Sequence, residues 1–505
     1  MLLNKFPEKE QFQRLARNYN VIPVCVEILA DTETPVSLLR KIYKNKGPVF
    51  LFESVEGGER WGRYSFMSAS ARSHIRVYRD FVEIENNGSA EKIPHQKDPL
   101  NVLRDFMKRF KPASVPGLPR FWGGLVGYLT YEMVSFFEAI PNRLPQDKPF
   151  AHFIIPDELL IFDNVRNTLL CIVISFTDGK EDADKIYENV CTRIESMLTE
   201  MNQDLKVYLK ADDLVARKSN KLTAMLKDEV FRSKVKKAKK HIRKGDIIQA
   251  VISQPFACKA PLDLWSLYRV QRFINPSPYL YFLHLDNLAL VGSSPETMVR
   301  LEKGIATLRP IAGTRPRGKN EQGDRVNADE LLKDEKERAE HLMLVDLGRN
   351  DLGRVAKTGT VQVTDLMVVE RYSHVMHLVS NICCDLKSGF DAWNLLSSTF
   401  PAGTLSGAPK VRAMEIIDEL EQEPREAYGG AVGYISFDGN MDMAITIRTA
   451  CIENGRLTVR AGAGIVADSD PEKERIETVN KAMALQKALE LMGGVADSSQ
   501  LKTDS

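Results

Sequence analysis

Short apolar runs, each closed by turn-forming residues, make up most of the first 180 positions. Runs of this kind lie at 49–56, 73–80 and 159–176, and they have the length and composition of strands. Several follow one another too closely for a helix to fit between them. Neighbouring runs are therefore expected to pair as antiparallel strands.

The periodicity changes from strand to helix after Gly179. The stretch EDADKIYENVCTRIESMLTEM has a helical spacing of apolar residues, and the polar stretch that follows it, up to Leu222, has no clear period. We interpret that polar stretch as a linker. The prediction is an N-terminal domain at 1–205, a linker at 206–225, a second domain at 226–494 and a disordered tail at 495–505.

Strand-like and helix-like segments are interleaved in the second half. The runs YLYFLHL, LALVGSS, AVGYISF and MAITIRTACI have strand character, whereas 328–348 and 471–492 have the composition and spacing of long helices. This order predicts an α+β fold with large antiparallel sheets.

The balance of charge excludes some classes of partner. Lys and Arg number 69 against 68 Asp and Glu, so the formal net charge is +1 and no global field attracts nucleic acid or an anionic membrane. A basic amphipathic helix is predicted at 231–244, and a solvated helix face explains it better than a nucleic-acid site does. We therefore expect binding to neither nucleic acid nor membrane.

The cysteines and the apolar content indicate the cytoplasm. Seven cysteines lie scattered without the C-x-x-C spacing of a zinc site, and their odd number argues against a disulfide framework. The first residues have no signal-like apolar core, and the longest apolar stretch falls short of the roughly 20 residues that span a membrane. We expect a cytoplasmic protein.

Two predicted helices each carry a pair of glutamates three residues apart. Glu337 and Glu340 lie in one of them, and Glu474 and Glu477 lie in the other. Taken alone, such pairs usually belong to a solvated helix face. If the two pairs converged, four carboxylates would form an oxygen-rich site suited to Mg²⁺.

Four glycine-rich segments occur where no linker is expected. They are RPIAGTRPRG at 309–318, FPAGTLSGAPK at 400–410, AYGGAVGY at 427–434 and RAGAGIVADSDPE at 460–472. Glycine beside a strand marks either close approach to a ligand or a bulge in a twisted sheet, and the sequence leaves both open. Backbone N–H groups of such turns can bind a carboxylate without a Walker or Rossmann pattern, and neither pattern is present.

The motifs together resemble one family. SSPE, PIAGT, ERAEHLMLVDLGRNDLGRV, MHLVS, GTLSGAPK, YGGAVGY, ITIRT and AGAGIVADSDPEKERIET, spread over about 230–490, are similar to the chorismate-utilising enzymes. LFESVEGG and WGRYSF resemble the regulatory domain of anthranilate synthase component I. The resemblance implies antiparallel sheets packed as a sandwich with flanking helices. It also implies the Mg²⁺-dependent conversion of chorismate and ammonia to anthranilate and pyruvate, which begins tryptophan biosynthesis.

The resemblance also assigns roles to residues at matching positions. Glu340 and Glu477 would bind Mg²⁺ directly, with Glu337 and Glu474 close by and acting through water. Glu296 would give a proton to the departing C4 hydroxyl, and His377 would serve the elimination of pyruvate, although an isolated histidine is more often structural. Thr314 is placed with these catalytic residues. The substrate-binding positions are Gly313, Thr314, Thr404, Tyr428, Arg448, Gly462, Ala463, Gly464 and Lys481.

Two positions favour one branch of the family. Ala312 stands where many aminodeoxychorismate synthases carry a catalytic lysine, and a methyl group forms no covalent adduct. Gln249 stands where isochorismate and salicylate synthases use a lysine to activate water, and a neutral amide is no general base. Ammonia is therefore the expected nucleophile.

Regulation and the source of ammonia also follow from the resemblance. Ser54, Pro278, Tyr279 and Leu280 match the positions that bind the feedback inhibitor L-tryptophan, although Leu280 replaces a commoner Met. No cysteine has the G-x-C-x-G setting of a glutamine amidotransferase. The resemblance thus implies a separate amidotransferase subunit in a 2+2 heterotetramer, with free ammonia as an alternative donor.

Two other functions remain open at this point. An aminodeoxychorismate synthase large subunit that dispenses with the lysine would release a product still carrying its enolpyruvyl group. A catalytically idle, tryptophan-binding regulatory partner would keep the fold without the chemistry. The presence of Glu296, Glu340, His377 and Glu477 argues against the idle partner.

Overall fold

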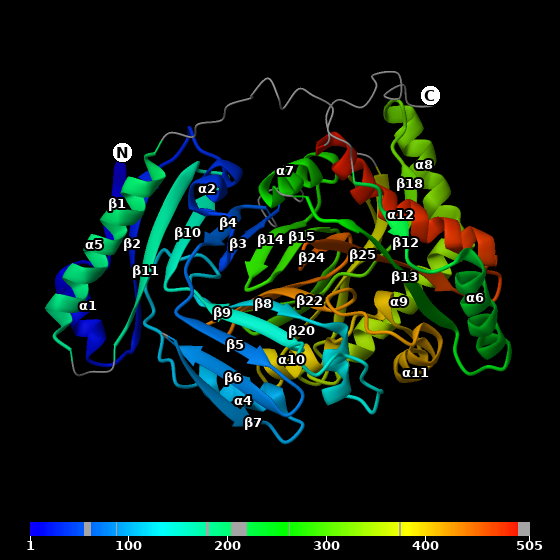
Figure 1. Cartoon of the computed structure of the whole chain (residues 1–505), viewed down its shortest axis with the longest axis horizontal. Coiled ribbons are helices and arrows are strands. Elements are labelled where there is room, and N and C mark those ends of the chain that lie inside the picture. The colour runs from blue at the N-terminus through cyan, green and yellow to red at the C-terminus, as the bar shows by residue number, and fades with distance from the viewer. Residues whose placement is uncertain are drawn as a thin grey trace.

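Two large antiparallel sheets form the centre of the molecule, and helices lie around them (Figure 1). The computed structural model describes residues 1–54, 62–86, 88–177, 181–203, 220–261, 263–372 and 375–492. Most of the predicted linker and the whole predicted tail lie outside these residues. The predicted α+β class with large antiparallel sheets is confirmed.

The first sheet holds strands from both halves of the sequence. Its spatial order is β1 (Leu2–Phe6), β2 (Val21–Leu29), β11 (Thr168–Phe176), β10 (Glu158–Asp163), β4 (Tyr64–Ser68), β3 (Val49–Glu53), β14 (Tyr279–Leu285), β15 (Leu288–Ser294), β24 (Thr449–Glu453), β25 (Arg456–Ile465), β13 (Gln249–Lys259) and β12 (Thr223–Ala224), with β21 (Gly407–Ala408) paired to β13.

The second sheet is built in the same way. Its order is β18 (Ile311–Pro316), β20 (Val375–Asp385), β17 (Ile305–Leu308), β16 (Thr297–Glu302), β23 (Met441–Ile445), β22 (Ala431–Ser436), β8 (Gly124–Leu129), β9 (Ala151–Ile155), β5 (Ser73–Val77), β6 (Phe81–Asn86) and β7 (Ser89–Pro94), with β19 (Gln362–Arg371) paired to β20.

Both sheets cross the boundary between the two predicted domains. In the first sheet β3 pairs with β14, and Phe52 lies opposite Tyr281. In the second sheet β8 pairs with β22, and Gly127 lies opposite Gly433. The two halves of the sequence are therefore hydrogen-bonded to each other within each sheet.

Aromatic side chains fill the space between the sheets. Phe121 stacks on Tyr434 of β22 with ring centroids 4.3 Å apart, and Phe66 of β4 meets Phe121 edge-on at 5.4 Å. Phe66 belongs to the first sheet and Tyr434 to the second, and all three rings are buried. Such pairs stabilise a core beyond the burial of their area.

The described residues form helices around the sheets (Figure 1), together with 3₁₀ turns. They are α1 (Lys9–Ala16), α2 (Pro35–Ile42), α4 (Pro99–Met107), α5 (Ala183–Met201), α6 (Asp228–Arg243), α7 (Leu264–Ile274), α8 (Glu321–Lys333), α9 (Glu335–Gly353), α10 (Ala392–Thr399), α11 (Lys410–Glu421), α12 (Pro471–Met492), η1 (Tyr131–Phe136) and η3 (Gly403–Leu405). Among the described residues, no helix combines the length and the apolar character needed to cross a membrane.

Two elements predicted as continuous are broken. The helix expected at 328–348 is divided into α8 and α9 at Asp334, whose carboxylate accepts hydrogen bonds from the N–H groups of Lys336 and Glu337 and so caps α9. The strand expected in MAITIRTACI is divided into β23 and β24 because Arg448, between them, has a left-handed φ of 50°. Both breaks lie next to residues predicted to bind substrate or metal.

The structure answers the question that two glycine segments left open. A Cβ on Gly433 would lie 2.1 Å from the carbonyl oxygen of Asp442, and β22 pairs with both neighbours without a shift of register. This glycine permits close approach of strands and makes no bulge. Gly313, by contrast, has φ +66° and lies where the register of β18 against β20 shifts, so it is a bulge.

Glu132 of η1 is a buried carboxylate with an incomplete set of partners. Its Oε1 accepts a hydrogen bond of 2.6 Å from the N–H of Arg425, while its Oε2 finds no hydrogen-bond partner among the described residues. Burial raises the pKa of this carboxyl to about 7. The unfolded chain therefore releases this proton at lower pH than the folded chain does, so ionisation of Glu132 lowers stability as pH rises from 4.5 through 7.

We predict that Glu132→Gln removes this pH dependence. The free energy of unfolding of the variant, relative to the wild type, should rise by about 2 to 3 kcal/mol between pH 5 and pH 8. Urea unfolding at the two pH values measures it, with the exposed Glu195→Gln as the matched control. An equal difference at both pH values would contradict the prediction.

Candidate active site

A cavity of about 270 Å³ gathers most of the residues predicted to act on substrate. Strands β13, β18, β20 and β25, helices α9 and α12, and the turn η3 all contribute to its wall. The predicted residues that line it are Glu296, Thr314, Glu340, His377, Thr404, Tyr428, Arg448, Gly462, Gly464, Glu477 and Lys481. The bulge at Gly313 and the break at Arg448 both border this space.

Four predicted residues, Gly313, Glu337, Ala463 and Glu474, are not among the residues that line the cavity. The carbonyl oxygen of Gly313 accepts a hydrogen bond from His377, and Ala463 is buried in β25 opposite Ile252. Glu337 lies 3.5 Å from the guanidinium of Arg315. Glu474 precedes Glu477 by one turn of α12, and the pKa of its carboxyl is raised by burial and by the charge of Glu477.

The carboxylates of Glu340 and Glu477 come from different helices and face the same cavity. Burial raises the pKa of the Glu340 carboxyl, and the negative charges of Glu337 and Glu477 raise it further. Glu477 is paired with Lys481 at 2.7 Å. Among the described residues no three of the four glutamates bring their oxygens within 4.8 Å of one another.

This donor set suits Mg²⁺, which takes oxygen ligands and commonly needs only one or two carboxylates besides water and an anionic substrate. Among the described residues that line the cavity, His377 is the one histidine, and no cysteine is present. Mutual repulsion of the carboxylates is also relieved by a cation. The residues present therefore fit the predicted ion.

Glu296 is the cavity's buried acid. It follows β15, and burial raises the pKa of its carboxyl to about 7, against the opposing effects of Thr404, Arg448 and Lys481. A carboxyl with such a pKa is partly protonated near neutral pH. It can therefore donate a proton to a departing hydroxyl group, which then leaves as water.

His377 of β20 is held in one orientation. Its Nδ1 lies 2.8 Å from the carbonyl oxygen of Gly313 and 3.1 Å from Oγ1 of Thr314. A carbonyl only accepts, so Nδ1 carries the hydrogen and Nε2 keeps its lone pair. Burial also lowers the pKa of the imidazole, which favours the neutral form of a base.

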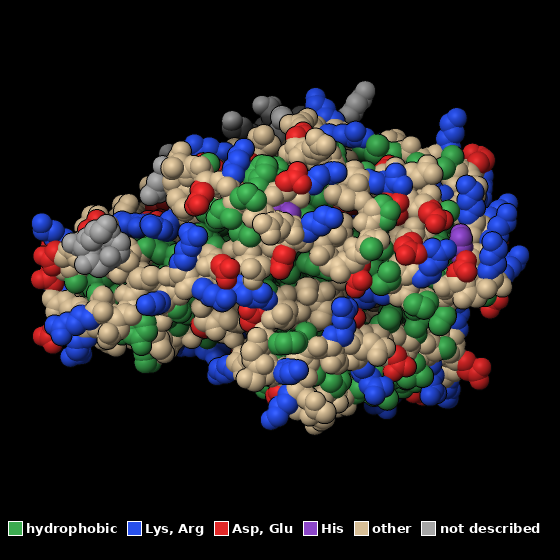
Figure 2. All heavy atoms as spheres, turned by 90° about the horizontal axis from the view of Figure 1, so that it is seen from below, with side chains coloured by type: hydrophobic (Ala, Val, Ile, Leu, Met, Phe, Trp, Pro, Cys, Tyr) green, Lys and Arg blue, Asp and Glu red, His purple; other side chains and the backbone are tan. Residues whose placement is uncertain are grey.

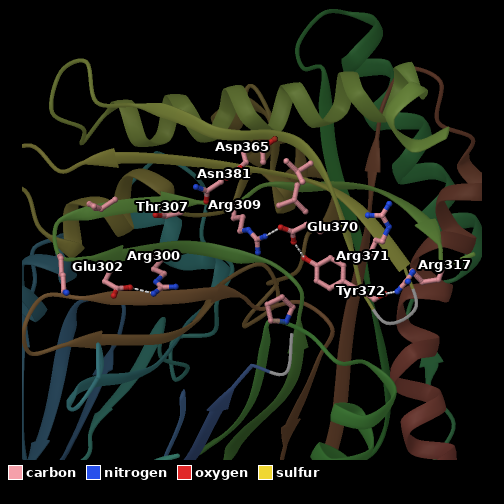
Figure 3. A pocket seen from close by; sticks show the side chains of 16 residues that line it. Arg300, Glu302, Thr307, Arg309, Arg317, Asp365, Glu370, Arg371, Tyr372 and Asn381 are labelled. Carbon is pink, nitrogen blue, oxygen red and sulfur yellow. Dashed lines mark hydrogen bonds and ion pairs between the residues drawn. The ribbon is translucent and has the colours of Figure 1, made fainter. Parts of the chain in front are cut away.

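A polar chain behind His377 was not evident in the sequence. The ring of Tyr372 meets the imidazole edge-on at 5.6 Å, and its hydroxyl donates to Glu370 at 2.9 Å. Arg309 donates to the same carboxylate, and the three side chains line a neighbouring groove (Figure 3). Glu370 lies in β19, Tyr372 follows that strand and Arg309 precedes β18, and no local motif relates them.

Gly462 lines the cavity at a place where there is no room for a side chain. A Cβ there would lie 2.6 Å from the hydroxyl of Tyr428 and 3.2 Å from the carbonyl oxygen of Ile252. The ammonium group of Lys481 donates to the carbonyl oxygen of Gly462 at 2.9 Å. Arg460, a lining residue that sequence reasoning missed, bonds to Glu423 and to the carbonyl oxygen of Pro424.

An outer chamber of about 690 Å³ adjoins the cavity. The two spaces share Thr314, His377, Arg448, Glu477 and Lys481 as lining residues, and the outer one is also lined by Ile274, Asn275, Pro276, Ser277 and Pro278. The segment after α7 therefore forms one side of the approach to the cavity.

The four residues predicted to bind an inhibitor meet in a separate small pocket. Ser54, Pro278, Tyr279 and Leu280 line a space of about 50 Å³ between the sheets. Ligand pockets commonly measure about 300 to 1,000 Å³. The pocket therefore has to widen before a side chain as large as indole can enter.

A group of possible metal ligands lies outside the cavity wall. Among the described residues it is the one set of three whose ligand atoms lie within 4.8 Å of one another: His74, His152 and Asp286. Nδ1 of His74 lies 3.2 Å from Nε2 of His152, and Arg76 binds Asp286 at 2.7 Å. Because a guanidinium already neutralises that carboxylate, the cluster is explained by its own hydrogen bonds.

The basic helix α6 offers no second site. Lysines and arginines are mixed with acidic side chains over the face shown in Figure 2. Arg232 of α6 pairs with Glu472 at 2.8 Å, and Val235 and Ala238 of the same helix are buried. The solvated amphipathic helix predicted from the sequence accounts for it.

Comparison with known proteins identifies close relatives. A family model described as chorismate binding enzyme matches residues 58–487. An anthranilate synthase component 1 from Aquifex aeolicus (strain VF5) is 48% identical over 494 residues, which cover 97% of this chain and 98% of the relative. A protein of the same name from Pseudomonas aeruginosa is 46% identical over 493 residues, with 96% and 98% covered.

Solved structures agree with these matches. Anthranilate synthase component I from Streptococcus pneumoniae TIGR4 has a TM-score of 0.75 and 34% identity, with 91% of this chain and 98% of that chain covered. The menaquinone-specific isochorismate synthase from Escherichia coli has a TM-score of 0.71 over 95% and 98%, but its 18% identity shows a shared fold alone. The resemblance drawn from the motifs is confirmed.

We predict that Gly462→Ala weakens binding of chorismate, the ligand that the motifs predict. The added methyl would displace Tyr428 or the strand beside it, and the dissociation constant should rise at least about tenfold. Isothermal titration calorimetry measures the effect. Gly353→Ala, where an added Cβ meets nothing within 4 Å, is the control, and equal affinities of the two variants would contradict the prediction.

Proposed function

Because the chain belongs to the chorismate binding enzyme family, we propose that it is the large, chorismate-using component of an anthranilate synthase. It would convert chorismate and ammonia to anthranilate and pyruvate, at the start of tryptophan biosynthesis. The near-full-length identity to proteins named anthranilate synthase component 1 supports this assignment. The proposed setting is the cytoplasm.

One observation carries the choice of branch. Gln249 and Ala312 both line the cavity that holds Glu296, Glu340, His377 and Glu477. At these two positions sister enzymes use lysine, as a base for water or as a nucleophile. An amide and a methyl group supply neither chemistry, so an incoming ammonia molecule fits the cavity best.

Substrate would be held through its two carboxylates. Arg448 and Lys481 supply positive charge on one side of the cavity, and Tyr428 contributes a hydroxyl. The backbone at Gly462 and Gly464 lets a planar group approach closely. Glu340 and Glu477 would hold Mg²⁺, which would supply positive charge to offset the ring carboxylate beside these two glutamates.

The protein's own groups then move the protons of both stages. Ammonia forms a bond to C2 while the C4–oxygen bond breaks, Glu296 protonates the departing hydroxyl to give water, and the Glu296 carboxylate takes a proton back from the new C2 ammonium group. In the second stage Nε2 of His377 takes the proton from C2, the C3–oxygen bond breaks, and the ring becomes aromatic. The enolpyruvate that leaves becomes pyruvate when its methylene carbon gains that proton. The tautomer fixed by Gly313 leaves Nε2 free to accept that proton.

Ammonia would be supplied by a glutamine amidotransferase subunit. The relatives are named component 1, and this supports the existence of a second component. A 2+2 heterotetramer is the proposed assembly, with free ammonium salts able to replace the partner. Direct turnover with ammonium therefore allows this chain to be tested alone.

L-Tryptophan would inhibit the enzyme from the small pocket at Ser54. The pocket combines apolar walls with Arg120 and Asp442, which are paired at 3.1 Å. The carboxylate and ammonium groups of a zwitterionic amino acid could pair with Arg120 and Asp442 in place of the existing ion pair. Its ring would then enter the space between the sheets. The pocket would have to widen, so binding would be coupled to movement of β3 against β14.

The first experiment is product identification. The purified chain with chorismate, Mg²⁺ and ammonium at alkaline pH should give fluorescent anthranilate and pyruvate. EDTA or Glu477→Gln should lower turnover at least about a hundredfold, since metal and anion binding are lost together. Glu490→Gln, on the same helix outside the cavity wall, is the control.

The products separate the alternatives. A product that still carries its enolpyruvyl ether would assign the chain to an aminodeoxychorismate synthase, and a product without nitrogen would assign it to a water-using branch. Tryptophan binding without any turnover would indicate the idle regulatory partner. Each of these results would replace the proposal.

A second prediction tests the inhibitor site. Ser54→Leu fills the small pocket, so the tryptophan concentration for half-inhibition should rise at least about tenfold. Inhibition is measured relative to each variant's own rate without tryptophan. Ser233→Leu on the exposed face of α6 is the control. Unchanged inhibition in Ser54→Leu would place the inhibitor elsewhere.

A further inference from the structure

The segment that follows α7 belongs to the walls of two different spaces. Pro278 lines both the small pocket at Ser54 and the outer chamber in front of the cavity. Residues before it line only the chamber, and Tyr279 and Leu280 after it line only the pocket. A change in the width of the pocket therefore moves a segment that begins at the C-terminal end of α7.

Helix α7 is also tied directly to the pocket. Arg272 forms an ion pair with Glu53, a strand residue that is buried and lines the pocket next to Ser54. Glu53 lies opposite Leu280 in the pairing of β3 with β14. Burial raises the pKa of the Glu53 carboxyl, and the positive charge of Arg272 opposes that rise. Arg272 therefore stabilises the ionised form of Glu53.

The neighbouring residue of α7 is tied to the active site. Gln271 is buried, and its side-chain amide donates a hydrogen bond of 2.8 Å to the carbonyl oxygen of Arg448. Arg448 has a left-handed φ of 50°, a conformation that a non-glycine residue keeps only when its surroundings hold it. The N–H of Ser293 donates to the same carbonyl at a longer 3.3 Å.

From these contacts we propose that Gln271 is a positioning residue for Arg448, and that the Arg272–Glu53 ion pair couples the small pocket to it through α7. Widening of the pocket moves β3 and its Glu53. Arg272 is paired with that carboxylate, so α7 moves with it as a rigid helix. Gln271, the preceding residue of α7, then changes its hydrogen bond to the backbone of Arg448. The guanidinium that lines the cavity is then displaced.

This inference rests on the proposed function, because Arg448 is taken to hold a substrate carboxylate and the small pocket to hold tryptophan. It adds residues that touch neither ligand. Gln271 and Arg272 line neither the cavity, the outer chamber nor the small pocket. Their effect must therefore be indirect, which gives it a distinct kinetic signature.

The test uses the full chain with ammonium as donor, and measures KM for chorismate and kcat with and without tryptophan. Gln271→Met keeps the size of the side chain and removes the donor. KM should rise at least about tenfold and kcat should change less than about threefold, because ground-state positioning is lost. Gln271→Glu, whose carboxyl at low pH is again a donor, should recover part of the loss as pH falls.

Arg272→Gln tests the coupling separately. Tryptophan binding, measured by calorimetry, should stay within about fivefold of the wild type, while the factor by which tryptophan raises KM should fall at least about tenfold. Arg269→Gln, an exposed arginine one turn earlier on α7, is the matched control and should keep both values. Circular dichroism and a thermal melt establish that each variant is folded.

The outcomes separate this inference from the proposed function. If the wild-type chain makes no anthranilate, both fail. If it makes anthranilate but is not inhibited by tryptophan, the coupling through α7 is wrong, and KM of Gln271→Met still decides the positioning role. If the wild type is active and inhibited, but Gln271→Met keeps the wild-type KM or loses only kcat, the positioning role is wrong. If Arg272→Gln retains full coupling, α7 does not carry the signal. Should one variant fail to fold, the other still decides its own half of the proposal.

Discussion

The hydrogen-bond ladders between β3 and β14 and between β8 and β22 determine how everything else is arranged. Each ladder joins a strand from the first half of the chain to one from the second, at the middle of its sheet. Side chains between the sheets pack across the same boundary. As a result the small pocket and the cavity are built on the same hydrogen-bonded framework of strands.

The cavity is dominated by the cost of burying charge. Glu296 and Glu340 both have carboxyl pKa values raised by burial, and Arg448 and Lys481 face them from other elements. A cation near Glu340 and an anionic group near Arg448 would each offset charge that these side chains bring to the cavity wall. The same burial keeps Glu296 able to hold a proton and His377 able to accept one.

Local patterns predicted a large share of this structure. Periodicity predicted the strands at 49–56, 73–80 and 159–176 and the two helices that each carry a pair of glutamates. The motifs identified most of the residues that line the cavity. The breaks at Asp334 and Arg448 were not predicted, because a single cap or a single left-handed residue overrides an otherwise regular pattern. The ladders that join the halves, and the chain from Arg309 through Glu370 to Tyr372, depend on contacts between distant residues that no local period encodes.

The narrowness of the pocket at Ser54 has a consequence for timing. A ligand that requires a wider pocket binds the protein molecules in which the pocket is open. Its apparent dissociation constant is therefore the intrinsic value divided by the fraction of protein molecules with an open pocket. Association is then paced by the opening of a packed sheet interface and not by diffusion alone. A ligand of this pocket would bind slowly. The enzyme would therefore respond to sustained changes in the ligand's concentration and much less to brief ones.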